Sequence, residues 1–291
     1  GTIVIGGCLF FTPSVRQITV VGLALFSAVM VRQIYLWLAA GAWLSTMLDS
    51  KLLRWSIPVE DRAPWSPGSV AVISTSICLS LVALFSLFMC WGGLVPPLFQ
   101  TLHNSGMNSA VPTIILTSVA AYAFPFLIVH FNRIREASNA GAYLVVGLVC
   151  GGLLGVLLES APGADLGRFG GWAWIIAEMC PVVYGRSVFL TLGTAAGGAT
   201  LAGLCILINS TTQRRIQILI WIFFISYVLA MTANSQSFQR YYDAQILMGI
   251  AWAMTFTFKA NTGDEQKTVI AAIWMSVVQL CLSWHSVYSN I

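Results

Sequence analysis

The stretch Ala142-Tyr-Leu-Val-Val-Gly-Leu-Val-Cys-Gly-Gly-Leu-Leu-Gly-Val-Leu-Leu158 has no charged residue. As an α-helix it would be about 25 Å long, close to the ~30 Å hydrocarbon thickness of a bilayer. Lipid offers no water to the backbone, so a segment crossing it must satisfy its own hydrogen bonds as a helix. This stretch therefore predicts a transmembrane helix.

Similar apolar spans recur along the chain and predict an all-α, polytopic transmembrane bundle of about 8–9 spans. Residues 1–291 then form a single transmembrane domain. Ile18–Leu48 is interrupted at Arg32, so it is either one long tilted helix or two short helices hinged there. Gly1–Phe11 is too short to cross, and we expect it to be the end of a span in a longer chain. The other expected spans are Val70–Trp91, Val111–Phe131, Ala142–Leu158, Val188–Ile208, Ile216–Asn234, Ala244–Phe258 and Thr268–Ser286.

Composition agrees with a lipid environment. Hydrophobic residues make up 58% of the chain and charged residues 8%, against roughly a quarter charged in soluble domains. The cations are scattered over loops, so no nucleic-acid partner is expected. The seven cysteines form no C-x-x-C pair and lie mostly in apolar spans, which favours simple packing. The three histidines are dispersed, and neither a metal nor a cofactor is expected.

Positive charge predicts the orientation, because cytoplasmic loops carry the excess of Lys and Arg. The side with the larger number is expected to be cytoplasmic, and residues 92–110, 159–187 and 235–243 are then extracytoplasmic. If Ile18–Leu48 is two helices, Arg16 joins the majority side, Arg32 joins the minority side, and the bias grows. The majority side holds nine cations, Lys51, Arg54, Arg62, Arg133, Arg135, Arg214, Arg215, Lys259 and Lys267, and the other side holds four, Arg16, Arg168, Arg186 and Arg240.

One outer segment is apolar but too short to cross. Trp172–Tyr184 carries Glu178 in its middle, where full burial in lipid would be costly. An aromatic segment of this length suits a helix lying in the interface. We therefore expect Trp172–Tyr184 to lie along the outer surface of the membrane.

Small residues recur at every fourth position in two spans. Glycine at this spacing lets two helix backbones approach closely, so we expect tight packing, with each other as one option. A substrate groove or a moving interface is the alternative. The residues are Gly147, Gly151 and Gly155 in one span, and Gly193, Gly197, Ala199 and Gly203 in the next.

The candidate site is Arg240-Tyr241-Tyr242-Asp243, at the outer start of a late span. An arginine can grip a phosphate with two nitrogens, and tyrosines are apolar with one polar tip. A nearby carboxylate can deprotonate a hydroxyl. The alternative is that these residues only anchor the helix at the interface. Other ionisable groups on this side are Glu159, Asp165, Arg168, Glu178 and Arg186.

The stretch Phe238-Gln-Arg-Tyr-Tyr-Asp-Ala-Gln-Ile-Leu-Met248 resembles the R-Y-x-x-P/E-x-L stretch of GT-C membrane glycosyltransferases. Only Arg240 and Tyr241 match functional positions of that motif, and its proline is missing. The resemblance implies sugar transfer from a polyprenyl-phosphate donor outside the cytoplasm, with a loop helix like Trp172–Tyr184. The family's acid usually lies in the first outer loop, where this chain shows no acidic pair.

The sequence is compatible with three functions. The first is a GT-C type glycosyltransferase, whose partners are the bilayer and a lipid-linked sugar donor. Its expected donor-binding residues are Arg240, Tyr241, Tyr242 and Arg186, and its candidate catalytic carboxylates are Asp243, Glu178 and Asp165. The second is a transporter or lipid flippase, which predicts internal repeats. The third is a non-catalytic scaffold in a larger membrane assembly.

Overall fold

The computed structural model describes most of the 291-residue chain, and its contacts divide into two compact units. Unit 1 comprises Gly1–Ser105 and Gln213–Met231, and unit 2 comprises Gly106–Thr212 and Thr232–Ile291. The described residues are 15–31, 35–48, 67–93, 97–100, 107–161, 169–209, 214–233, 237–238, 240–258 and 265–288.

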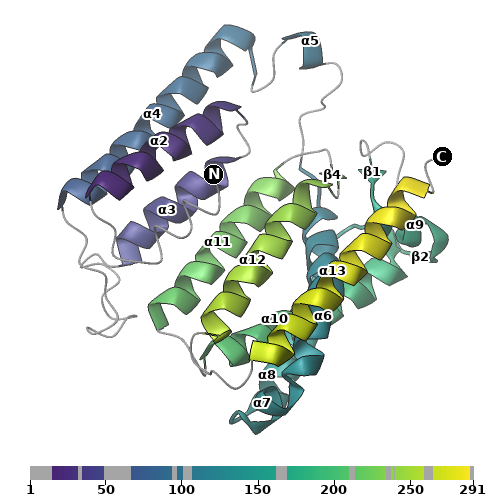
Figure 1. Cartoon of the computed structure of the whole chain (residues 1–291). Coiled ribbons are helices and arrows are strands. Elements are labelled where there is room, and N and C mark those ends of the chain that lie inside the picture. The colour runs from purple at the N-terminus through teal and green to yellow at the C-terminus, as the bar shows by residue number, and fades with distance from the viewer. Residues whose placement is uncertain are drawn as a thin grey trace. The chain divides into compact units, whose positions relative to one another are not determined.

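The described chain is mostly helical (Figure 1). Every expected span from Val70 onward contains a long helix, and Ile18–Leu48 is two helices rather than one. Gly1–Phe11 lies outside the described residues. Four described segments are long and apolar enough to cross a membrane, fewer than the 8–9 expected, so the full span number stays a prediction. They are Val70–Trp91, Val111–Val129, Ala140–Leu157 and Val188–Ile208.

Unit 1 contains α2 (Val15–Val31), α3 (Leu36–Leu48), α4 (Pro67–Trp91), α5 (Pro97–Gln100) and α11 (Arg214–Thr232). Gly22 of α2 lets that helix approach α4, because an added Cβ would clash with the hydroxyl oxygen of Ser76. Trp37 of α3 makes edge contacts with Phe223 and Tyr227 of α11, and all three rings are buried.

Unit 2 is built around α6 (Val111–Val129) and α10 (Val188–Asn209), which pack together. α8 (Ala140–Leu157) covers the other side of α10. The remaining helices are α7 (Phe131–Glu136), α9 (Trp172–Met179), α12 (Arg240–Phe258) and α13 (Glu265–Tyr288). The strands are β1 (Phe169–Gly170), β2 (Val182–Val183), β3 (Arg186–Ser187) and β4 (Ser237–Phe238).

The glycine stripe of α8 packs directly against α10, whereas Gly193 and Gly197 of the α10 stripe face α6 at Thr117 and Leu116. The expected tight packing is confirmed, with α6 as the neighbour of the second stripe. A Cβ added at Gly155 would lie 2.9 Å from Thr191 Cα, and one at Gly151 would lie 3.1 Å from Ala195 Cα. Thr191 Oγ1 also donates to the Gly155 carbonyl oxygen at 3.3 Å. Small residues therefore bring the two backbones together and allow a hydrogen bond between the helices.

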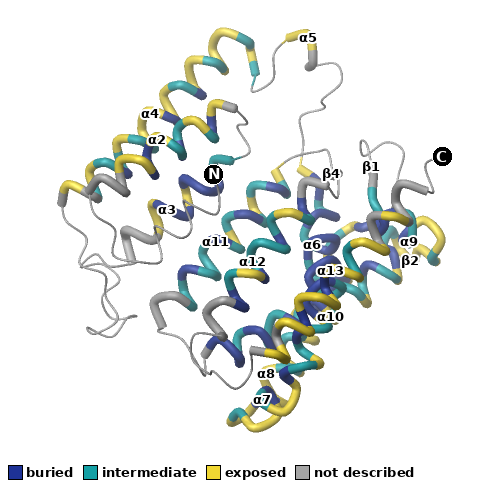
Figure 2. The backbone as a smooth tube through the Cα atoms, viewed as in Figure 1, coloured by how far each residue is buried: buried dark blue, intermediate teal, exposed yellow. Residues whose placement is uncertain are grey.

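α8 buries its small residues and exposes its large ones. Its buried residues are Ala140, Gly151 and Gly155, while Val149, Leu153 and Leu157 are exposed (Figure 2). In water this arrangement would leave a large apolar surface uncovered. In lipid it is favourable, because acyl chains solvate the large side chains and the glycines drive packing. The burial pattern thus supports a membrane-crossing role for α8.

Contacts fix the relative directions of α6, α8 and α10. Thr113 lies near Thr194, and Leu127 lies near Gly203, so α6 and α10 run in parallel. Gly147 faces Gly198 whereas Gly155 faces Thr191, so α8 is antiparallel to α10. The end of α8 therefore lies beside the start of α10. The intervening segment, residues 158–187, returns to the end of the bundle from which it leaves.

Candidate functional site

Two expected outer loops meet in a short parallel sheet. β1 pairs with β4, with Phe169 opposite Ser237 and Gly170 opposite Phe238. Along the chain, β1 is followed by α9 and β4 is followed by α12 (Figure 1). Because the strands are parallel and in register, the starts of α9 and α12 lie at the same edge of this sheet. Arg240 is the first residue of α12.

α9 begins inside unit 2 rather than on its surface. The indole nitrogen of Trp172 donates to the Tyr122 hydroxyl at 3.0 Å, and both residues are buried. Tyr122 lies eleven residues into α6, about 16 Å along the helix. The interfacial position expected for Trp172–Tyr184 is therefore not confirmed. Gly171, which precedes the helix, has φ 123°, a value that favours glycine.

The helix in this segment is also shorter than expected. It ends at Met179, and residues Val182–Ser187 form an antiparallel hairpin of β2 and β3. Pro181 has no backbone N–H for a continuing helix. Tyr184 and Gly185, the two turn residues, have φ of 48° and 73°, as a type I′ hairpin turn requires.

Arg186 holds this hairpin against the end of α8. Its Nε donates to the Val156 carbonyl oxygen at 2.7 Å, and its Nη1 donates to the Tyr184 carbonyl oxygen. An arginine at this place satisfies an unpaired carbonyl in the last turn of a helix and complements the helix dipole. These contacts give Arg186 a structural role, and its role in donor binding stays a prediction.

The three candidate carboxylates do not form one described cluster. Glu178 is exposed on α9. Asp243 is partly buried in the first turn of α12, where a negative charge is favourable. Asp165 lies outside the described residues, as does Arg168. Among the described residues, no group of three or more His, Cys, Asp or Glu side chains lies together.

The donor-binding residues near Asp243 differ in what the structure describes. Arg240 and Tyr241 lie at the start of α12, and their side chains are outside the described set. Tyr242 is fully buried. A donor can reach its ring only if neighbouring side chains move, so its contact with a donor stays a prediction.

Two buried polar atoms were not singled out in the sequence. Ser118 Oγ on α6 and Gln245 Oε1 on α12 are buried without a hydrogen-bond partner. A buried, unpaired polar group costs about 1–3 kcal/mol, so each is a point where unit 2 would gain from a polar ligand. The sequence alone does not show which Ser or Gln side chains in an apolar span are unpaired and which are hydrogen-bonded to their own helix.

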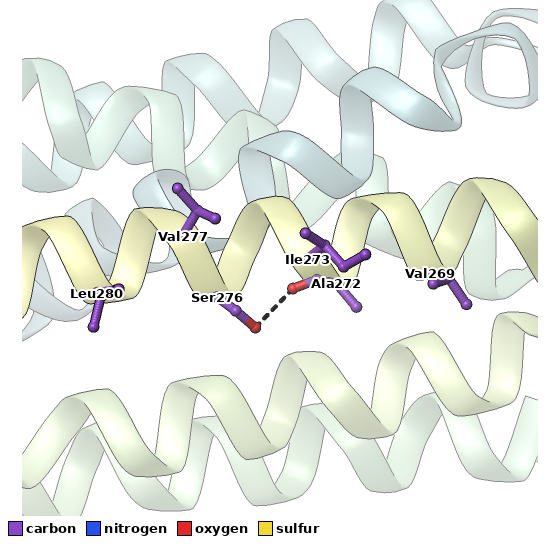
Figure 3. A pocket seen from close by; sticks show the side chains of 6 residues that line it. All are labelled: Val269, Ala272, Ile273, Ser276, Val277 and Leu280. Atoms are coloured by element: carbon purple, nitrogen blue, oxygen red, sulfur yellow. Dashed lines mark hydrogen bonds between the residues drawn. The ribbon is translucent and has the colours of Figure 1, made fainter.

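An open groove of about 390 Å³ runs along one face of α13 (Figure 3). The Ser276 hydroxyl in it donates to the Ala272 carbonyl oxygen at 2.9 Å, so the polar group is bonded within its own helix. The surface is otherwise apolar and carries no candidate catalytic residue. Its described lining residues are Val269, Ala272, Ile273, Ser276, Val277 and Leu280.

Comparisons with protein-family models, curated protein sequences and solved structures found no match to this chain.

Proposed function

We propose that the chain is a multi-pass membrane glycosyltransferase that binds a polyprenyl-phosphate sugar donor beside the starts of α9 and α12. The parallel pairing of β1 with β4 is the observation that carries the proposal. It sets two helix N-termini at one edge of a small sheet, and each N-terminus has a partial positive charge. In this proposal Arg240, the first residue of α12, contributes a full positive charge to donor binding.

These charges suit a leaving phosphate. In the proposed reaction, a carboxylate takes the proton of an acceptor hydroxyl, and the hydroxyl oxygen attacks the anomeric carbon of the sugar. The bond between that carbon and the phosphate oxygen breaks, which releases the polyprenyl phosphate. Arg240 stabilises the negative charge that grows on the phosphate.

Asp243 is the first candidate for the base, because it lies one helical turn from Arg240. Glu178 and Asp165 are the alternatives, since both lie in the segment that contains β1 and α9. The site lies on the extracytoplasmic side in this proposal, with residues 92–110, 159–187 and 235–243 outside.

Donor binding by three variants tests the proposal. Arg240→Lys keeps the charge but loses the planar fork, and Arg240→Ala loses both. We expect Arg240→Ala to abolish most binding of a polyprenyl-phosphate sugar and Arg240→Lys to weaken it. Arg135→Ala, which removes an exposed arginine on α7, is the matched control and should bind like wild type. All measurements use protein of equal folded yield in lipid nanodiscs.

Equal donor binding by wild type, Arg240→Lys and Arg240→Ala would make Arg240 an interfacial anchor. That result would remove the main support for a glycosyltransferase and favour a scaffold. Donor binding without sugar transfer, together with movement of the lipid between leaflets, would identify a flippase.

A further inference from the structure

The β2–β3 hairpin projects an apolar tip, and we infer that this tip is a membrane anchor that contacts phospholipid at the headgroup boundary. Tyr184 is 89% exposed, and Met179 beside the hairpin is 80% exposed. Val182 and Val183 are about half exposed. The inference concerns a surface of unit 2 and does not depend on the proposed enzymatic activity.

The hairpin is fixed at the level where α8 ends. Arg186 Nε bonds to the Val156 carbonyl oxygen, and the backbone N–H groups of Ser160 and Ala161 donate to the Gly185 carbonyl oxygen at 3.2 and 3.1 Å. Val188 N–H donates to the Pro181 carbonyl oxygen at 3.0 Å and closes the base of the hairpin. The tip is therefore a preorganised feature of the fold.

The length of α8 sets where this level lies in a bilayer. Its 18 residues make a helix of about 27 Å, which matches the hydrocarbon thickness. Val156 and Leu157, its last exposed apolar residues, are thus at the boundary. Glu159 is exposed just beyond, and its Oε1 would lie 3.7 Å from a Cβ added at Gly185. The hairpin turn therefore lies between the apolar end of α8 and the charged side chain of Glu159.

The backbone at Tyr184 gives a second, independent reason. A positive φ is unfavourable for a bulky residue, and the first position of a type I′ turn favours Asn, Asp or Gly. Turn chemistry does not explain a tyrosine here, and neither does packing, since the ring is almost fully exposed. An interfacial contact explains it, because tyrosine combines an apolar ring with a polar tip and is enriched at membrane boundaries.

Phospholipid is the occupant that these observations favour. The apolar tip continues the exposed face of α8 at Val156 and Leu157, the face that acyl chains would cover in a bilayer-crossing helix. The tip therefore extends a lipid-facing surface to the headgroup level.

Depth measurement in phospholipid nanodiscs tests this inference. A spin label is attached at Tyr184→Cys in a variant lacking the native cysteines, and its exposure to oxygen and to a water-soluble nickel complex is compared. Leu153→Cys on the exposed face of α8 is the lipid reference, and Ser138→Cys in an exposed turn is the water reference. We expect the label at 184 to lie about 15 Å from the bilayer centre, half the hydrocarbon thickness.

A photo-crosslinking side chain at position 184, in a chain that keeps its native cysteines, supplies a second measurement. We expect covalent phospholipid adducts at 184 comparable with those at 153, and none at 138. A label as water-exposed as that at 138, with no lipid adduct, would overturn the inference. Shielding from both reagents with crosslinks to protein would also overturn it and would identify a protein partner or a second copy.

Discussion

Gly151 and Gly152 are neighbours on α8 with opposite steric surroundings. A Cβ at Gly151 would lie 3.1 Å from backbone atoms of both Thr194 and Ala195, whereas one at Gly152 would lie 3.7 Å from the Ala195 Cβ. We expect Gly151→Ala to destabilise the protein by about 1–3 kcal/mol, because the two backbones must move apart. Gly152→Ala should be neutral or stabilising by up to about 1 kcal/mol through helix propensity. Thermal unfolding in one detergent compares the two, and equal effects would contradict the close α8–α10 packing.

The Trp172–Tyr122 hydrogen bond ties the start of α9 to α6. Tyr122→Phe removes the hydroxyl and leaves the buried indole N–H without its acceptor, so we expect a loss of about 1–3 kcal/mol in unfolding free energy. Tyr143→Phe, at an exposed position of α8, is the control and should change stability little. A Tyr122→Phe protein as stable as this control would show that α9 is held by other contacts.

Residue types predict the close packing of α8 through its glycines, but they do not predict the β2–β3 hairpin. Gly147, Gly151 and Gly155 differ from their neighbours only in size, and their spacing places that difference on one helix face. At Tyr184 the residue type argues against the turn that forms there, because a positive φ is atypical of tyrosine. The hairpin depends on long-range bonds from Arg186 to Val156 and from Ser160 to Gly185, which no local pattern encodes.

At the scale of elements, the pairing of β1 with β4 makes the candidate site one structure. Cysteines at Phe169 and Ser237 occupy opposed positions and should form a disulfide, because opposed residues in adjacent strands have Cα atoms within bonding range. The control pairs Phe169→Cys with Phe238→Cys. Successive strand positions face opposite ways, so this pair should crosslink much less. Mass spectrometry after mild oxidation, in a background without native cysteines, measures both.

Equal crosslinking by the two pairs would show that the register is not fixed. An absence of crosslinking in both pairs would show that the two loops are not adjacent.

The helices could be predicted from the sequence because each apolar span carries its own signal. The two strands of each sheet are only two residues long, and β1 and β4 are separated by α9 and α10 among other elements. Their pairing is decided by how the helices pack, so the sequence predicts that both loops lie outside but not that they touch.

At the scale of the whole molecule, cation distribution and helix direction give independent information about sidedness. The cations predict which side is cytoplasmic. The packing of unit 2 predicts which loops share a side: α8 ends beside the start of α10, and Phe169 pairs with Ser237. Ser138 lies two residues before the start of α8 and is therefore at the other end of this helix, about 27 Å away along an 18-residue span.

Single-cysteine labelling in intact cells combines these two arguments. We expect Ser237→Cys to react with a membrane-impermeant reagent added outside, and Ser138→Cys to react only after the membrane is opened. Both variants lack the native cysteines, and labelling of denatured protein provides the total for each. Labelling of both positions from one side would contradict the crossing of α8. The reverse pattern, with Ser138→Cys reactive from outside, would keep the fold but invert the orientation, so that Arg240 and Asp243 would face the cytoplasm and the extracytoplasmic glycosyltransferase proposal would fail.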